Sequence, residues 1–170
     1  MSVSEHKAAA KQAIRCTVIT VSDTRTEETD SGGALLMQML KDAGHIVEHY
    51  FIIQDETLMI QEKIKTIASL KSSDAILLTG GTGIAKRDHT YEAVQVLLNK
   101  EMTGFGELFR YLSFVEDIGS AAILSRAVAG VYQDTAVFSM PGSRGAIRLA
   151  MQRLILPELG HVVREIKKDL

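Results

Sequence analysis

The stretch LLTGGTGIAKRDHT at residues 77–90 combines a flexible backbone, two cations and an acid. Gly80, Gly81 and Gly83 allow positive φ angles and let a ligand approach the backbone without interference from a Cβ atom. Successive amide N–H groups in such a turn, followed by a helix, form a concave site for an anion. The stretch matches neither GxxxxGK[ST] nor GxGxxG. It therefore predicts either an atypical phosphate-binding loop or a tight turn between a strand and a helix.

Asp88 stands beside this loop, although a carboxylate repels phosphate. Two interpretations are open: Asp88 caps the helix expected after it, or it holds Mg²⁺, which bridges carboxylate and phosphate oxygens. Asp55 presents the same choice, because it too precedes an expected helix. Lys86 and Arg87 are either solvated surface cations or charges that stabilise a leaving group.

A second group of polar residues lies further along the chain. Pro141-Gly142-Ser143 again places a turn before an expected helix, where Ser143 either caps the helix or binds an anion. Ser125 and Arg126 add a hydroxyl group and a planar cation suited to an oxyanion. A structural role is the alternative for each of them.

The elements that must position these residues alternate between strands and helices. Runs rich in β-branched and apolar residues predict strands at 16–21, 45–53, 74–79, 127–133 and 134–140. Apolar residues at helical spacing predict helices at 35–43, 60–68 and 90–99, a loop and then a helix within 101–119, and two tail helices broken at Pro157. The alternation predicts one α/β domain over residues 14–170, with a mostly parallel sheet between two helical layers. Residues 1–13 are predicted to be a flexible lead-in.

Ligands of open parallel sheets bind beyond the carboxyl ends of the strands, where the strand order reverses. Three predicted loops reach that edge: one that begins with Ser22 and Asp23, one that contains Asp55, and the glycine loop. If the strand order is 2-1-3, the first and third loops bracket the point of reversal. The candidate residues are therefore expected to meet there.

Composition excludes several classes of function. The 170 residues are 46% hydrophobic and 24% charged, as in ordinary globular chains. The net charge of −2 does not support general nucleic-acid binding. No apolar run approaches the roughly 18 residues of a membrane span, and the N-terminus lacks the apolar core of a secretory signal, so a cytoplasmic location is expected.

The cysteine and histidines point away from covalent and zinc chemistry. Cys16 is the single cysteine, and its apolar neighbours predict a buried strand residue. The five histidines show no ligand spacing for zinc, and no nucleophile motif is present. Any chemistry is expected to be electrostatic.

Several short segments occur together in one order. They are VSD at 21–23, DSG at 30–32, QDE at 54–56, TGGTGIAKRDHTYEA at 79–93, GFGELFR, LSRAVAG, MPGS and PELGHVV. This combination, which runs from about Arg15 to Val163, resembles the family of molybdenum cofactor biosynthesis protein B and molybdopterin adenylyltransferase. LSRAVAG and PELGHVV are more similar to the protein B branch.

The resemblance implies a three-layer α/β/α molybdopterin-binding fold that assembles as trimers, sometimes paired into hexamers. Active members couple molybdopterin to the AMP part of ATP, require Mg²⁺ and release pyrophosphate. The product is then primed for metal insertion by a second protein. Members of the protein B branch need not all be active.

The resemblance also implies roles for individual residues. The two essential aspartates of the family match Asp55 and Asp88, which are expected to be catalytic and to bind the metal. The glycine loop is expected to bind phosphate, and Ser125, Arg126 and Ser143 to line the pterin side. The full set of expected substrate and phosphate contacts is Ser22, Asp23, Thr79, Gly80, Gly81, Thr82, Gly83, Lys86, Arg87, Ser125, Arg126, Pro141, Gly142 and Ser143.

Three alternatives accompany this hypothesis. A non-catalytic molybdopterin carrier would use the same pocket without releasing pyrophosphate from ATP. A Rossmann-type oxidoreductase is disfavoured because the glycines follow the third strand and the first loop lacks a dinucleotide fingerprint. An assembly module is the third alternative, although 170 residues leave no room for a further domain.

Overall fold

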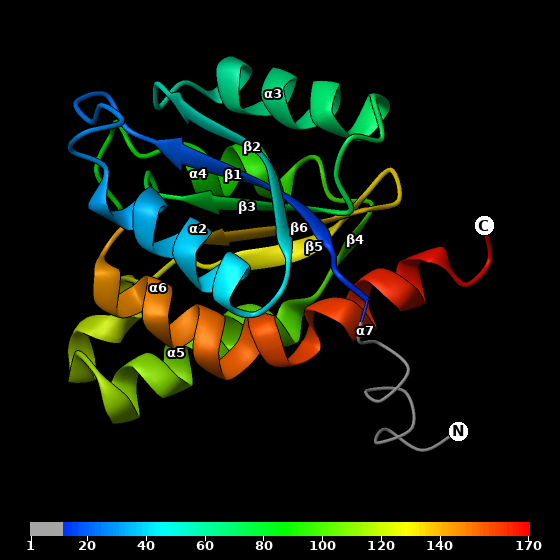
Figure 1. Ribbon diagram of the computed structural model, residues 1–170. Coiled ribbons are helices and arrows are strands. Elements are labelled where there is room, and N and C mark those ends of the chain that lie inside the picture. Colours follow the sequence, from blue (N-terminus) through cyan, green and yellow to red (C-terminus); the bar gives the residue numbers. More distant parts are fainter. Residues whose placement is uncertain (1–11) are drawn as a thin grey trace.

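Six strands form one sheet in the computed structural model, which describes residues 12–170. They are β1 (Arg15–Val21), β2 (Ile46–Ile53), β3 (Ala75–Thr79), β4 (Lys100–Glu101), β5 (Val128–Tyr132) and β6 (Thr135–Met140), in the order β2-β1-β3-β6-β5-β4. The four strands from β2 to β6 in that order are mutually parallel, and β5 is antiparallel to both β6 and β4 (Figure 1). The sheet contains the order 2-1-3, which is the condition under which the first and third loops bracket the point of reversal. The lead-in predicted over residues 1–13 falls, except for its last two residues, outside the described part of the chain.

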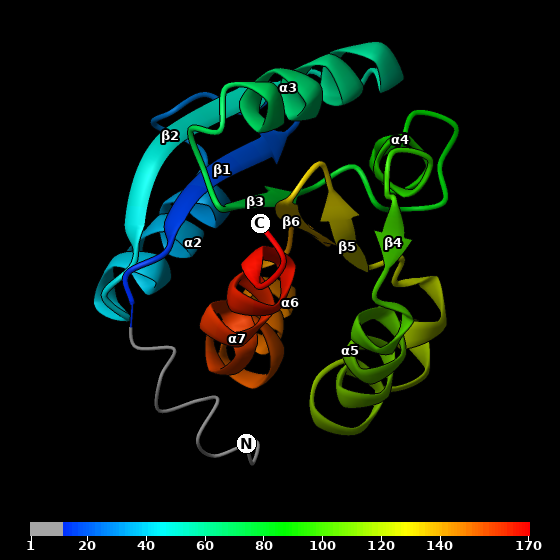
Figure 2. The same ribbon diagram turned by 90° about the vertical axis from the view of Figure 1, so that its right-hand side faces the viewer.

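Helices cover both faces of this sheet (Figure 2). One face carries α3 (Thr57–Ser69) and α4 (Thr90–Gln95). The other carries α2 (Ser31–Asp42), α5 (Thr103–Glu116), α6 (Arg144–Ala150) and α7 (Leu156–Lys167), with a 3₁₀ segment η1 (Gly119–Leu124) beside α5 and a π-helical segment η2 (Met151–Ile155) between α6 and α7. The three-layer α/β/α prediction is confirmed.

The residues at 75–78 of β3 are all apolar because the strand is central in the sheet and is covered by helices on both faces. Ala75 and Leu77 pack into the core under α2, α5, α6 and α7, whereas Ile76 and Leu78 pack into the core under α3 and α4. All four side chains are fully buried. Burying a Leu or Ile contributes about 2 kcal/mol, so both layers are anchored on this strand.

A tight hairpin turns the chain back between β5 and β6. Its two linking residues, Gln133 and Asp134, both have positive φ angles (43° and 63°), as hairpin turns matched to strand twist require. Val128 consequently lies opposite Ser139 near the carboxyl end of β6. The segment that precedes β5 therefore reaches the same edge of the sheet as the carboxyl ends of the parallel strands.

Two predictions about helices were wrong. The tail is one continuous helical run through Pro157, because η2 ends at Ile155 and the proline lies in the first turn of α7, where a missing N–H is tolerated. The helix predicted to end at Asn99 ends at Gln95. The Asn99 N–H donates to the carbonyl of Val131 (2.8 Å), so the chain joins the sheet and continues as β4 where a loop was predicted.

Candidate functional site

The loops that follow β1, β2, β3 and β6 meet at one edge of the sheet. The Ser22 N–H donates to the Ile53 carbonyl (2.8 Å), and the Gly80 N–H donates to the Met140 carbonyl (3.2 Å). The Thr79 hydroxyl, which is buried, donates to the Pro141 carbonyl (3.2 Å). These bonds fix the glycine loop between the first loop and the 141–143 turn, as the strand order requires.

The glycines let the loop lie directly against two acids. Gly80 and Gly81 have φ angles of +96° and +65°, a region that side chains other than hydrogen disfavour. A Cβ atom on Gly81 would collide with the Asp55 carboxylate, and one on Gly83 would lie 2.6 Å from Asp88 Oδ2. The backbone of one loop thus contacts the carboxylates of Asp55 and Asp88.

Asp55 is held in a buried position by backbone groups of the other loops. It is 6% exposed, and its Oδ1 accepts a hydrogen bond from the His89 N–H (3.0 Å). Its own N–H donates to Asp23 Oδ1 (3.1 Å), and His89 Nδ1 lies 2.9 Å from its carbonyl oxygen. Burial raises the pKa of Asp55, assisted by the negative charges of Asp88 and Asp23 and opposed by His89.

Neither acid caps the helix that follows it. The residue at the start of α3 is Glu56 and that at the start of α4 is His89, and neither end has a side-chain cap. Asp88 Oδ2 instead accepts from the Ala85 N–H (2.8 Å) inside its own loop. The cap interpretation is therefore excluded for both residues, although Asp55 accepts from the N–H group at the start of α4.

Unused oxygen atoms remain next to the glycines. Within residues 12–170, Asp55 Oδ2 and Asp88 Oδ1 accept no hydrogen bond, and the buried Thr90 hydroxyl has no partner. A Cβ on Gly81 would meet both Thr90 Oγ1 and Asp55 Oδ2, so both oxygens lie close to the Gly81 backbone. Hard oxygen donors of this kind suit Mg²⁺. The described residues form no cluster of three or more His, Cys, Asp or Glu arranged for a metal, and Mg²⁺ commonly takes its other ligands from water and phosphate.

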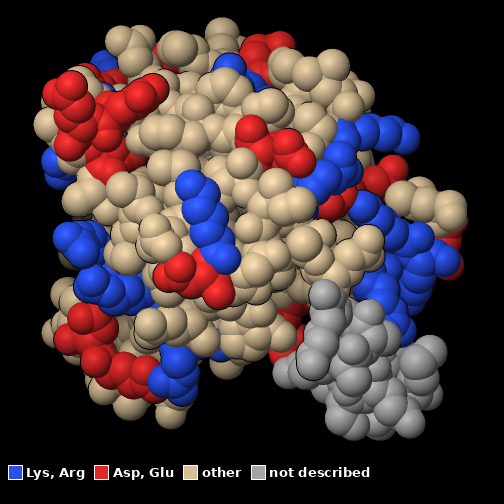
Figure 3. All heavy atoms as spheres, viewed as in Figure 1, with Lys and Arg blue, Asp and Glu red and all other residues tan. Residues whose placement is uncertain are grey.

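The two cations of the loop differ in their surroundings. Arg87 pairs with Asp23 (2.7 Å) and Glu56 (3.4 Å), and the hydrogen bond from Arg87 lowers the pKa of Asp23. Lys86 is exposed. Figure 3 shows acidic atoms gathered at the end of the molecule where the loop after β1 lies. Arg87 is thus engaged by neighbouring acids, and its role toward a leaving group stays a prediction.

The later motifs reach the same edge. Ser143 Oγ accepts from the Ala146 N–H (3.1 Å) and caps α6, so the capping interpretation is confirmed. Arg126 contacts the carbonyl oxygens of Thr82 and Gly83, and the half-buried Ser125 precedes it. Their proposed contacts with a pterin stay predictions.

A cavity of about 200 Å³ lies between the first loop, the glycine loop and the 141–143 turn. Its lining is Thr20, Val21, Ser22, Arg25, Asp30, Ser31, Gly32, Thr79, Gly80 and Gly142. The Ser22 hydroxyl shapes its rim by accepting from the N–H groups of Thr24 and Arg25. The cavity therefore combines segments that are far apart in sequence.

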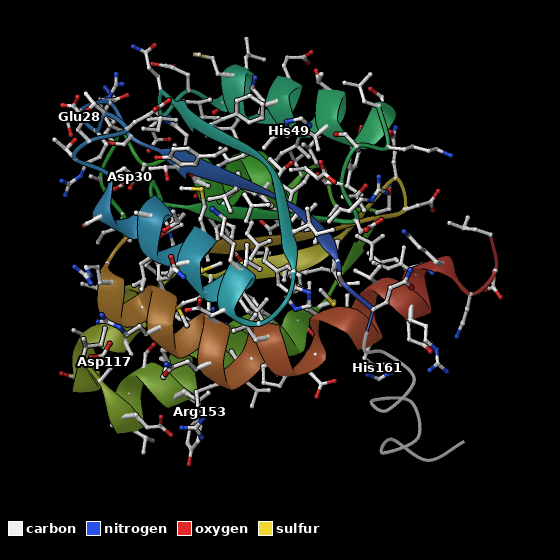
Figure 4. All side chains as sticks on the ribbon, in the orientation of Figure 1. Glu28, Asp30, His49, Asp117, Arg153 and His161 are labelled. Atoms are coloured by element: carbon white, nitrogen blue, oxygen red, sulfur yellow. The ribbon has the colours of Figure 1, made fainter. Side chains whose placement is uncertain are left out.

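Asp30 is a residue of this cavity that the sequence analysis did not assign. It is buried, caps α2 by accepting from the Gly33 N–H (2.9 Å), and accepts from the Tyr50 hydroxyl (2.5 Å). Figure 4 shows Asp30 at the start of α2. An aspartate just before a helix is a recognisable cap signal, whereas the contribution of Tyr50 from β2 had no signal in the sequence.

Comparisons with known proteins decide the family. The model of a probable molybdopterin-binding domain matches residues 17–161. The chain belongs to this family. Molybdenum cofactor biosynthesis protein B from Halalkalibacterium halodurans and that from Bacillus subtilis are each 59% identical to it over 169 residues, covering 99% of both chains.

Solved structures agree with this membership. A crystal structure of molybdenum cofactor biosynthesis protein B is 54% identical and superposes with a TM-score of 0.91, covering 93% of this chain and 98% of the other. A tungsten cofactor synthesizing protein from Pyrococcus furiosus is 34% identical, with a TM-score of 0.77 and coverage of 92% and 98%. Membership in the molybdopterin-binding family supports a role in molybdenum cofactor biosynthesis.

Among residues 12–170, no helix is both long enough and apolar enough to cross a bilayer.

Proposed function

We propose that this member of the molybdopterin-binding family binds molybdopterin and joins it to the AMP part of ATP, with release of pyrophosphate. The observation that carries the proposal is the contact of one glycine loop with two carboxylates from different positions, Asp55 and Asp88. Such an arrangement suits phosphate groups on the backbone side and a divalent cation on the carboxylate side.

In this reaction a terminal phosphate oxygen of molybdopterin attacks the α-phosphorus of ATP. The bond from that phosphorus to the bridging oxygen breaks, and pyrophosphate leaves with the electron pair. An ionised phosphate needs no general base, which agrees with a site that lacks a nucleophile motif. The protein contributes mainly positioning and charge compensation.

Asp55 and Asp88 would hold Mg²⁺, which supplies positive charge to the phosphate oxygens when bound. The remaining tasks fall to the chain itself. The loop backbone orients phosphate, and the buried setting of Asp55 keeps its carboxylate fixed by the His89 N–H. The 200 Å³ cavity beside Gly80 and Gly142 would receive part of the second substrate.

The proposal is tested by incubation with molybdopterin and Mg-ATP, with pyrophosphate and the adenylylated pterin measured together. Asp55→Asn and Asp88→Asn are each expected to lower turnover by about 100-fold or more, with folding and molybdopterin binding retained. Asp134→Asn in the β5–β6 turn is the matched control, since asparagine tolerates its positive φ of 63°.

Wild-type protein that binds molybdopterin but releases no pyrophosphate would replace the enzyme proposal with the carrier alternative. An Asp55 or Asp88 variant with wild-type turnover would show that the role assigned to that residue is wrong.

We also propose that the protein assembles with copies of itself through α5 and η1. Leu108, Tyr111 and Val115 lie at helical spacing on the outer face of α5 and are 52–62% exposed, and Ile123 of η1 is 82% exposed. The opposite face of α5, with Phe105 and Phe109, is buried in the core. An apolar face of this kind on a surface helix marks an interaction site. Sedimentation of wild type against Tyr111→Glu tests this, and a monomeric wild type would refute it.

A further inference from the structure

The guanidinium group of Arg126 is almost fully engaged by the glycine loop and the helix after it. Its Nε donates to the Thr82 carbonyl (3.1 Å) and its Nη2 to the Gly83 carbonyl (2.5 Å). Both Nη atoms also donate to the Glu92 carboxylate. A guanidinium carries five N–H groups, and these four bonds leave one for any ligand.

The same group is held from a second side. Its carbon lies 5.1 Å from the ring centroid of Tyr91, in a cation–π arrangement. Hydrogen bonds from Arg126 lower the pKa of the Glu92 carboxylate, which favours its ionised form. Arg126 reaches this place because β5 is antiparallel to β6, which brings the segment before β5 to the carboxyl ends of the parallel strands.

The two carbonyl bonds determine where the loop amides point. In a trans peptide unit, the carbonyl of one residue and the N–H of the next point in opposite directions, and the described chain has no cis peptide bond. The carbonyls of Thr82 and Gly83 point toward Arg126. The N–H groups of Gly83 and Ile84 therefore point away from it.

These two N–H groups are available for an acceptor. No hydrogen bond from either of them occurs within residues 12–170, whereas the neighbouring Ala85 and Asp88 N–H groups are bonded inside the loop. Adjacent amides that point to one side form an anion-binding nest. The nest is thus a consequence of the orientation that Arg126 imposes.

We infer that Arg126 is a positioning residue, which turns the Gly83 and Ile84 amides outward to receive a phosphate or pyrophosphate group. This inference rests on the proposed function for the identity of the ligand. It moves Arg126 from the expected pterin contacts to the support of the phosphate-binding loop. Lysine cannot replace it, because only a planar fork bonds two successive carbonyls and a carboxylate together.

The test compares wild type, Arg126→Lys and Arg126→Met in binding and in hydrogen exchange. Inorganic pyrophosphate with Mg²⁺ and molybdopterin alone are the two probes, because the phosphate could come from either substrate. Both variants are expected to bind one probe about tenfold or more weakly, as expected for the loss of charge-assisted bonds. Amide exchange at Gly83 and Ile84 is expected to slow when the probe binds wild type and to stay fast in both variants, with exchange in β1 and β3 unaltered.

Arg153→Met is the matched control. Arg153 is likewise paired with one carboxylate, that of Glu116 on α5, but lies on η2 away from the strand ends (Figure 4). It is expected to leave both affinities and the loop amides unchanged.

Each outcome has a defined meaning. Weaker pyrophosphate binding assigns the nest to the nucleotide, and weaker molybdopterin binding assigns it to the pterin phosphate. Wild-type affinity for both probes in Arg126→Met, or full recovery in Arg126→Lys, would overturn the inference. A wild type that binds pyrophosphate without turnover would refute the enzyme proposal alone, since the binding and exchange results do not depend on catalysis.

Discussion

Replacing Gly83 with alanine would move one catalytic candidate while leaving the rest of the site in place. A Cβ atom there would lie 2.6 Å from Asp88 Oδ2, 3.1 Å from Asp88 Cγ and 3.4 Å from Asp88 Oδ1. These three nearest atoms all belong to Asp88. Gly83 does not have a positive φ angle, so the substitution introduces a steric clash without backbone strain.

The distances from a Cβ on Gly83 to the Asp88 carboxylate determine how far that carboxylate must move. Ordinary van der Waals contact begins at 3.4 Å, so the carboxylate oxygen must retreat by about 0.8 Å, as close packing requires. The move weakens the hydrogen bond from the Ala85 N–H, which is worth about 1 kcal/mol. A displacement of about 1 Å in a reacting group costs roughly 100-fold in rate. We therefore expect a stability loss near 1 kcal/mol and a turnover loss between about 10- and 100-fold.

The assay measures adenylylation of molybdopterin against ATP and Mg²⁺ concentration, together with urea unfolding. Gly104→Ala is the control, because a Cβ at that position on α5 would have no atom within 4 Å apart from its chain neighbours and the backbone of its own helix. It should leave turnover unchanged. A Gly83→Ala protein with wild-type turnover and Mg²⁺ dependence would refute the reasoning that the location of Asp88 matters. A stability loss of several kcal/mol would refute the claim that the clash is local.

Two further predictions concern stability. Burial pushes the pKa of Asp74 upward, but hydrogen bonds from Arg15 and Lys167 outweigh it and lower the pKa to about 2. Because the folded pKa lies below the unfolded one, the ionised Asp74 carboxylate stabilises the fold above about pH 4, and this stabilisation of roughly 2 kcal/mol is lost as the pH falls toward 2. Urea unfolding of wild type and Asp74→Asn across this pH range measures the loss, and identical pH profiles of the two proteins would contradict the prediction. Tyr50→Phe should cost about 1–3 kcal/mol, because Asp30 Oδ2 is left buried without its donor. Tyr132→Phe on β5 is its control, because no hydrogen bond of the Tyr132 hydroxyl occurs within residues 12–170, and equal unfolding midpoints of wild type and Tyr50→Phe would show that the Tyr50 bond is not needed.

Local sequence predicted most of the elements, for identifiable reasons. The apolar run at 75–78 in β3 is typical of a central strand buried on both faces, and Gly44, with a φ of +84°, follows the first helix as expected. The predictions that were wrong depend on contacts made at a distance. Asn99 leaves the helix because Val131 offers a carbonyl, and the tail continues past Pro157 because the proline lies in the first turn of α7.

The sequence by itself determined which residues stand at the ends of the strands, since chain order and the parallel sheet place Asp55, Asp88 and the glycines at one edge. Only the tertiary structure decided how they meet. The His89 N–H donates to Asp55, which is 34 positions away in the sequence, and Arg126 donates to loop carbonyls that are more than 40 positions away. Such bonds depend on how separate elements pack together, and short-range sequence patterns carry no information about that packing. They make Asp55 a buried acid between loops where a helix cap was equally plausible, and they place the Arg126 side chain against two carbonyls of the glycine loop.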